Sequence, residues 1–308
     1  MLSLILLIIF YMKLICWISL FFSSCFCYAQ TGDGYLKTNA DDNTLLWEIS
    51  GNGLTKPGYL FGTFHMLCSD EIQFSTSLKK AIAKSREVYL ELDLDDPAVF
   101  AGAVMMISMK GGKKLKDLYS PEAYQRISAY FKDSLKTALA LYQNMKPGFL
   151  TALLYPKMMT CSSAISVDEA IMNLAHENNI GISGFETMAM QAAVFDSIPY
   201  EKQAEELLKA IDSIGNSVIQ FRLMLQAYKD QQLHDIEKII NDPVFGVEED
   251  RDLLLDKRNK RWVEQLKEIM KKGTVFIAVG AGHLVGKNGL IELLRAEGYT
   301  VRGLENRD

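Results

Sequence analysis

The chain has 308 residues, of which 49% are hydrophobic and 23% are charged, and its net charge is −5. These proportions are ordinary for a globular protein with a sizeable core, and the length allows one large domain or two small ones. The basic residues form no long run, which argues against a nucleic-acid-binding groove.

The first segment of the chain differs from the rest. Residues 1–29 are strongly apolar and contain a single charged residue, which predicts a secretory signal peptide. Translation is expected to start at Met12, with residues 1–11 as upstream read-through. Two alternatives stay open, namely a lipoprotein signal with Cys25 as the lipid anchor and an uncleaved membrane anchor. All three predict a secreted or periplasmic protein, with membrane attachment in the last two.

Only two of the five cysteines lie beyond this segment, Cys68 and Cys161. An exported domain of this size does not need a disulfide to fold. One bridge between the two residues and two buried unpaired thiols are equally compatible with the sequence. Neither cysteine has an adjacent histidine or a strand-to-helix elbow, so neither is expected to be a nucleophile.

The first part of the mature chain predicts a hairpin, a helix and a strand. Strand-like segments at 45–49 and 59–61 flank a glycine-rich connection. A helix is expected at 75–84. The segment 88–94 alternates strictly between apolar and polar residues, which indicates a strand with Glu91 on its polar face.

The middle of the chain is predicted to be mostly helical, and its end returns to a strand, a helix and a strand. Helices are expected at 97–110, from 121 onward, and at 167–177, 200–229, 233–241 and 248–271, with a short strand at 180–185. The closing elements are expected at 274–279, 289–296 and 299–304. Without a low-complexity linker, residues 30–308 are interpreted as one α/β domain with a helical insert at about 97–270.

Two apolar runs end in the same short motif. The stretch YLFGTFHM leads from Gly62 to His65, and VFIAVGAGHL leads from Gly280 to His283. Each motif is followed by a helix and a strand, so the two ends of the chain echo one another. In open sheets, functional groups collect at the carboxyl ends of strands, which predicts both histidines at one edge. Each glycine would permit a tight exit from its strand and close approach of the backbone to a bound cofactor.

Ordinary structural roles compete with these interpretations. A single histidine after an apolar strand is most often a hydrogen-bonded core or rim residue. Glu91 can be a surface carboxylate, because Asp93 shares its strand face. The zincin pattern fails after His176, and there is no Gly-x-Ser-x-Gly elbow.

Five stretches, taken in order, resemble the TraB/GumN family, which includes the Tiki-like metalloproteases. They are LLWEISGNGLTKPGYLFGTFHM, VYLELDL, GISGFETMAMQ, RNKRW and VFIAVGAGHLVGKNGLIELLRAEGYTV, which span Leu45 to Val301. The resemblance implies the fold of the erythromycin esterase and ChaN group. That fold is a central mixed sheet built from two related strand–Gly-x-x-His–helix–strand halves and wrapped by helices.

The resemblance also implies a divalent-metal site. Carried over to this chain, the motif histidines and the carboxylate of the following strand are His65, His283 and Glu91. Glu186 and Arg258 match further family positions with less defined roles. The metal would be manganese, cobalt or zinc, since neutral imidazole suits all three.

The chemistry of these residue types is consistent with hydrolysis. Two histidines and a carboxylate that leave positions open for water make a hydrolytic metal centre. A carboxylate not bound to metal, Glu91 or Glu186, is a candidate general base. Arg258 is a candidate for offsetting charge on a carbonyl oxygen, although a surface salt bridge with Asp256 is the alternative.

We therefore expect an exported, metal-dependent peptidase that acts on peptides or proteins. Two alternatives remain. One is a metal-free, esterase-like hydrolase with one histidine as the base. The other is a non-catalytic module on the same fold that binds haem or a metal ion.

Overall fold

The computed structural model describes residues 43–161, 163–242 and 249–308. The predicted signal peptide at 1–29, with its expected start at Met12 and the alternative lipid anchor at Cys25, lies outside these residues. Among the described residues, no helix combines the length and the apolar character needed to cross a membrane.

A six-stranded sheet forms the centre of the molecule, in the order β6-β4-β7-β2-β1-β8. Its strands are β1 (Leu46–Gly51), β2 (Gly58–Thr63), β4 (Glu87–Leu92), β6 (Gly181–Glu186), β7 (Phe276–Gly280) and β8 (Tyr299–Gly303). β1 is antiparallel to both of its neighbours, and the other adjacent pairs are parallel. The sheet is therefore mixed, and the predicted α/β class is confirmed.

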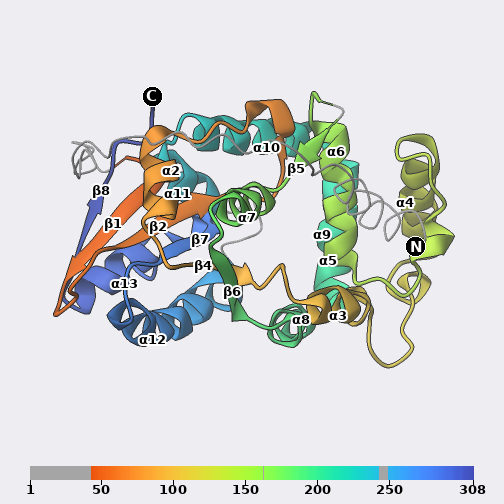
Figure 1. Cartoon of the computed structure of the whole chain (residues 1–308). Coiled ribbons are helices and arrows are strands. Elements are labelled where there is room, and N and C mark those ends of the chain that lie inside the picture. Colours follow the sequence, from red (N-terminus) through yellow and green to blue (C-terminus); the bar gives the residue numbers. More distant parts are fainter. Residues whose placement is uncertain (1–42, 162, 243–248) are drawn as a thin grey trace, which may run out of the picture.

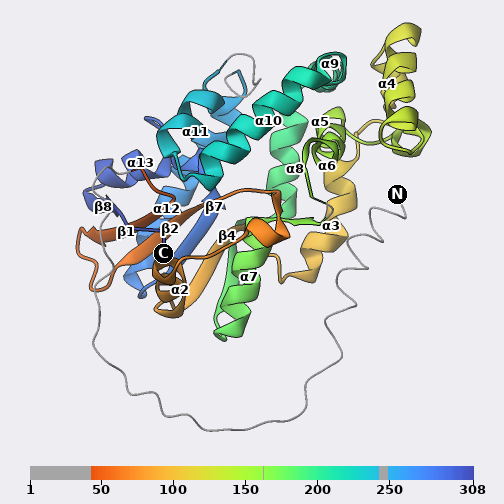
Figure 2. The ribbon, with the colours of Figure 1, turned by 90° about the horizontal axis from the view of Figure 1, so that it is seen from above.

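Helices cover both faces of this sheet. α2 (Thr76–Ala83) and α7 (Val167–Glu177) lie on one face, and α12 (Lys257–Lys271) and α13 (Leu290–Ala296) lie on the other (Figure 1 and Figure 2). A strand covered on both faces must be apolar throughout rather than alternating. β2 and β7 meet this requirement, because every residue of β2 and the first four of β7 are buried.

The two halves suggested by the sequence meet at the middle of the sheet. β2 and β7 are parallel neighbours, with Thr63 in register with Gly280. Their carboxyl ends therefore emerge at the same edge. The second strands of the halves lie on opposite sides of this pair, since β4 borders β7 and β8 lies beyond β1.

A second group of helices lies to one side of the sheet (Figure 1). Its members are α3 (Pro97–Ile107), α4 (Pro121–Asp133), α5 (Pro147–Thr151), α6 (Tyr155–Met158), α8 (Met188–Ser197) and α9 (Tyr200–Asp212). Part of this group has its own apolar core, around Phe131, Leu150 and Leu207. By contrast, α10 (Ile214–Lys229) and α11 (Leu233–Ile240) contribute Tyr228, Ile236 and Ile240 to the core around the sheet. The stretch 97–270 is not purely an insert, however, because it also supplies β6 to the sheet.

Two predicted helices have different boundaries in the structure. The pattern at 200–229 divides at Ser213 into α9 and α10, close to the poor helix former Gly215. The pattern at 248–271 begins with a π-helical turn, Asp252–Asp256 (η6), which continues into α12. Such π turns inside helices are frequent at functional sites.

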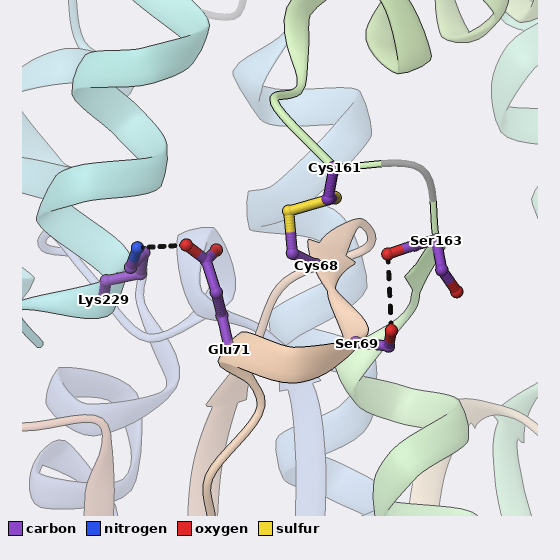
Figure 3. The surroundings of a disulfide bond; sticks show 6 residues. All are labelled: Cys68, Ser69, Glu71, Cys161, Ser163 and Lys229. Carbon is purple, nitrogen blue, oxygen red and sulfur yellow. Dashed lines mark hydrogen bonds and ion pairs between the residues drawn. A yellow bond between two sulfur atoms is a disulfide. The ribbon is translucent and has the colours of Figure 1, made fainter.

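A disulfide ties together two segments that are distant in sequence. Cys68 bonds to Cys161 (Figure 3), so the paired alternative is the one that the structure shows. Cys68 ends the short strand β3 (Leu67–Cys68), which pairs with β5 (Ala164–Ile165). The segment that follows His65 is thereby joined to the segment that leads into α7.

Candidate active site at the carboxyl ends of β2, β4 and β7

Three predicted site residues surround one glycine. A Cβ atom placed on Gly280 would lie 3.3 Å from Glu91 Oε1, 3.8 Å from His283 Cδ2 and 3.9 Å from His65 Nε2. The two imidazoles come from adjacent parallel strands, and the carboxylate comes from the strand on the other side of β7. The predicted convergence of His65 and His283 at one edge of the sheet is therefore observed.

A cavity of about 250 Å³ opens at this position. Its polar lining includes His65, Glu91, Asp168 and Arg258. Apolar residues from β4, η6 and α8 complete its wall. Three of the predicted polar residues, His65, Glu91 and Arg258, thus face a space that is bounded in part by apolar side chains.

His283 is rigidly held. Its side chain is 4% exposed, and its ring lies 4.5 Å from the ring of Trp262. Nε2 lies 3.1 Å from Arg258 Nη1, and Nδ1 lies 2.6 Å from Asn259 Oδ1. Because arginine can only donate, Nε2 is the acceptor and Nδ1 carries the proton. Burial lowers the pKa of His283 to about 3, which agrees with a neutral ring.

His65 is held much less tightly. Its side chain is 77% exposed, and Nδ1 lies 3.5 Å from Asp168 Oδ2. Asp168 Oδ1 accepts a hydrogen bond of 2.9 Å from the Thr63 hydroxyl. Asp168 Oδ2 is buried and has no hydrogen-bond partner within the described part of the chain. Pairing with Asp168 raises the pKa of His65 above its usual value.

Glu91 connects the turn of β7 to a guanidinium group. Oε1 accepts the Gly280 N–H at 3.0 Å, and Oε2 accepts Arg258 Nη2 at 2.5 Å. Burial alone would raise the pKa of Glu91, but the positive charges of the surrounding side chains and the Gly280 amide outweigh it and lower the pKa to about 2. The Arg258 guanidinium, which is bonded to Oε2, is one of these charges.

Glu186 serves to hold Arg258. Its side chain is fully buried at the end of β6, and both carboxylate oxygens accept hydrogen bonds from Arg258. Arg261, which is half-exposed, donates a further bond of 2.8 Å to Oε1. Both oxygens of Glu186 are therefore occupied by guanidinium groups, which leaves it poorly placed to accept a proton from a substrate.

Arg258 is buried and uses all five of its N–H donors. Nε bonds to Glu186, Nη1 bonds to the Leu254 carbonyl and to His283, and Nη2 bonds to Glu91 and Glu186. The alternative of a surface salt bridge with Asp256 is wrong, since Asp256 instead accepts from Asn288 and pairs with Arg251. The π turn places the Leu254 carbonyl at 3.0 Å from Nη1.

The two motif glycines have different surroundings. The side of Gly62 that would carry a Cβ faces Ala281 Cβ at 3.1 Å and Leu284 at 3.2 Å. Its missing side chain therefore lets the turn after β7 pack directly on β2. Gly280 instead faces the three site side chains, where a Cβ would crowd Glu91.

Sequence reasoning missed three residues of this network: Asp168, Asn259 and Arg261. Asn259 and Arg261 lie within RNKRW, so the motif that singled out Arg258 already contained them. Asp168 sits in the first turn of α7, where an acidic residue is ordinary for a helix start. Its burial and its contacts with Thr63 and His65, which the sequence does not show, distinguish it from an ordinary acidic residue at a helix start.

The two imidazoles and the Glu91 carboxylate are the types of ligand that a divalent cation binds. Each imidazole has its Nδ1 next to a protein acceptor, Asn259 for His283 and Asp168 for His65, which leaves Nε2 as the ligand atom. Metal-binding histidines are oriented in this way by their outer partners. Across the described ranges, no group of three or more such side chains already stands at coordination distance. Instead, Arg258 donates hydrogen bonds to Glu91 Oε2 and His283 Nε2.

Comparison with known proteins agrees with the resemblance noted in the sequence. The model of the TraB/PrgY/gumN family matches residues 45–303. Metalloprotease TIKI1 of Danio rerio is 25% identical, over 93% of this chain and 68% of the relative. Metalloprotease TIKI2 of Xenopus tropicalis is 25% identical, over 87% and 61%. Metalloprotease TIKI1 of Homo sapiens is 24% identical, over 84% and 61%. No solved structure matches the chain.

Proposed function

The chain belongs to the TraB/PrgY/gumN family, and on that premise we propose that it is an exported, metal-dependent hydrolase of peptide bonds. The observation that carries the proposal is the convergence of His65 Nε2, the His283 ring and Glu91 Oε1 on Gly280. Names of relatives as metalloproteases support the same reaction class.

His65, His283 and Glu91 would hold the cation, which could be manganese, cobalt or zinc. When bound, a divalent cation lowers the pKa of its water towards ~7 and polarises a carbonyl group. Glu91 suits the part of a ligand, because a carboxylate with a pKa of about 2 is a weak base near neutral pH. This proposal therefore departs from Glu91 or Glu186 as the general base.

Arg258 would stabilise the reacting carbonyl. In the structure, one Nη1 hydrogen points to His283 Nε2. With His283 Nε2 as a metal ligand, this N–H would be free to donate to a substrate oxygen in the same space. Glu186 and Arg261 keep the guanidinium in place during this exchange.

Two features support export. The apolar segment at 1–29 has the composition of a secretory signal. A disulfide between Cys68 and Cys161 is stable in oxidising compartments and rare in the cytosol. The proposal is a secreted or periplasmic protein, and fractionation of cells that express the full chain tests it.

Removal and return of metal tests the reaction. Purified protein should contain a divalent metal by mass spectrometry, and chelation should abolish peptide hydrolysis. Addition of manganese, cobalt or zinc should restore it in the wild type and not in His65→Ala or His283→Ala. Hydrolysis that persists after metal has been stripped would overturn the metal-dependent assignment.

That outcome would favour a second candidate, a metal-free hydrolase. The pairing of His65 with Asp168 supports it, since a carboxylate that orients an imidazole is the usual arrangement for a histidine base. Under this alternative, the wild type would hydrolyse peptides in the presence of a chelator. In the same assay, His65→Ala would be inactive and His283→Ala would retain part of the activity.

A further inference from the structure

The cavity beside the site has an apolar wall that the proposed chemistry does not use. α8 contributes Gln191, Val194 and Phe195, which are spaced along one face of the helix. The other apolar lining residues are Leu90, Leu92, Leu94 and Leu254. None of the side chains that α8 contributes is charged, although the rest of the lining holds His65, Glu91, Asp168 and Arg258.

The α8 wall is firmly anchored from behind. Asp196 lies 2.7 Å from Nζ of the fully buried Lys146 and 2.7 Å from Nζ of Lys110. The ring of Phe195 packs at 4.6 Å from the ring of Phe149. Gln203 donates hydrogen bonds of 2.9 Å to the backbone carbonyls of Phe195 and Ile198. A wall held by the buried Lys146–Asp196 pair and by ring packing keeps its shape, which a selective pocket requires.

The size of the cavity limits what it can receive. Pockets for drug-sized ligands measure roughly 300–1,000 Å³, whereas this cavity measures about 250 Å³. It fits one amino-acid side chain with its backbone rather than an extended ligand. Its uncharged α8 face penalises a charged side chain, which would lose its hydration there without gaining a charged partner on α8.

We propose that Val194 and Phe195 of α8, with Leu94 and Leu254, form a specificity pocket for one large apolar side chain. That side chain belongs to the substrate residue next to the bond that is cleaved, because the pocket and His65, Glu91 and Arg258 line one cavity. The inference rests on the proposed peptidase function and names its substrate class: peptides with leucine, methionine or phenylalanine beside the scissile bond.

The test uses peptides that differ at one residue, which is glycine, aspartate, lysine, leucine or phenylalanine. Cleavage rates and cleavage positions are measured by mass spectrometry with the metal-loaded full chain. The wild type should cleave the leucine and phenylalanine peptides at least about tenfold faster than the others, since apolar pockets discriminate on this scale. A preference for glycine or for a charged residue would overturn the pocket.

Val194→Asp and Ala193→Asp make a matched pair on α8. Ala193 is exposed, whereas Val194 lines the cavity. Val194→Asp should lower hydrolysis of the leucine and phenylalanine peptides about tenfold or more, and Ala193→Asp should leave it unchanged. Val194→Ala provides a milder variant, which should shift the preference from leucine towards phenylalanine. Equal profiles for Val194→Asp, Val194→Ala and the wild type would refute the proposal.

Binding separates this proposal from the function itself. Fluorescence anisotropy of the same labelled peptides needs no turnover. If no peptide is hydrolysed but the wild type binds apolar peptides more tightly than Val194→Asp does, the peptidase assignment fails and the pocket stands. If peptides are hydrolysed without any side-chain preference, the peptidase stands and the pocket fails.

Discussion

The two Gly-x-x-His turns share a sequence pattern but not a physical environment. In the turn after β7, His283 is buried against Trp262 and bonded at both ring nitrogens. In the turn after β2, His65 is 77% exposed and has one carboxylate at 3.5 Å. A repeated motif therefore supplies one fixed imidazole and one accessible imidazole to the same place.

The difference comes from what surrounds each turn. α12 passes beside the β7 turn and brings Arg258, Asn259 and Trp262 to His283 within two helical turns. Helix α10 packs on the β2 turn through Tyr228, which donates to the Gly62 carbonyl at 3.0 Å and lies against Phe64, but the only close side-chain partner of His65 in the described chain, Asp168, comes from α7. The Cys68–Cys161 bridge follows this turn. We infer that the β7 turn is the preformed half of the site and that the β2 turn is the adaptable half, which substrate or metal completes.

The largest effect is expected from the ion network on the β7 side. Arg258→Met removes a buried cation that pairs with Glu91 and Glu186 and leaves two buried carboxylates near each other. Breaking such a buried network costs about 3–5 kcal/mol of unfolding free energy, which urea denaturation measures. A variant as stable as the wild type would show that this half is not preformed by its charges.

Arg261→Met is the control for that experiment. Arg261 lies one turn further along α12 and also bonds to Glu186, but its side chain is 46% exposed. Solvent screens such a pair, so its loss should cost about 1 kcal/mol or less. Similar losses for the two variants would mean that burial does not distinguish the two arginines.

Elements on both sides of the site could be predicted from local sequence signals. β7 is an unbroken apolar run that ends in glycine, and its strand, turn and following helix all follow from local pattern. Ser166 as N-cap likewise fixes the start of α7, which was predicted at 167–177 and is Val167–Glu177. Elements whose boundaries depend on caps, glycines and buried runs are readable because the signal is local.

The unpredicted parts depend on contacts between distant residues. Apolar residues are spread around α8 rather than gathered on one face, so no amphipathic stripe marks it as a helix in the sequence. Asp168 reaches the β2 turn from 105 residues after Thr63. The shared edge of His65 and His283 could be inferred from parallel strand ends, but the outer partner of each imidazole could not.

The disulfide should account for much of the order on the β2 side. The bridge joins residues 93 apart in sequence, so its loss releases a long loop in the unfolded chain. Cys68→Ser with Cys161→Ser should lower the unfolding free energy by about 2–4 kcal/mol, measured by urea denaturation under non-reducing conditions. Reducing agent should destabilise the wild type similarly and leave the double variant unchanged, and equal stability throughout would contradict a structural role.

Alanine at the two histidines sharpens the comparison directly. His283→Ala removes a buried ring and leaves Asn259 Oδ1 unpaired, so it should lower stability by about 2–4 kcal/mol. His65→Ala removes an exposed ring and should change stability by no more than about 0.5 kcal/mol. Both should abolish turnover under the proposed function. Thermal and urea unfolding decide the point, and equal destabilisation would refute the division into fixed and adaptable halves.

The smallest effect is expected at Asp168, which acts on the reaction only through His65. Asp168→Asn keeps an oxygen for the Thr63 hydroxyl but replaces the carboxylate beside His65 Nδ1. Outer partners of metal-binding histidines contribute about 10–100-fold to metal affinity or activity, so both should fall by that factor while the melting temperature changes little.

Glu169→Gln is the control, because it makes the same carboxylate-to-amide change one residue along α7. It should alter neither metal affinity nor activity. Because His65 is largely exposed, nothing else in the described chain fixes its ring so closely. Unchanged metal affinity in Asp168→Asn would mean that the β2 turn orients His65 by its backbone alone.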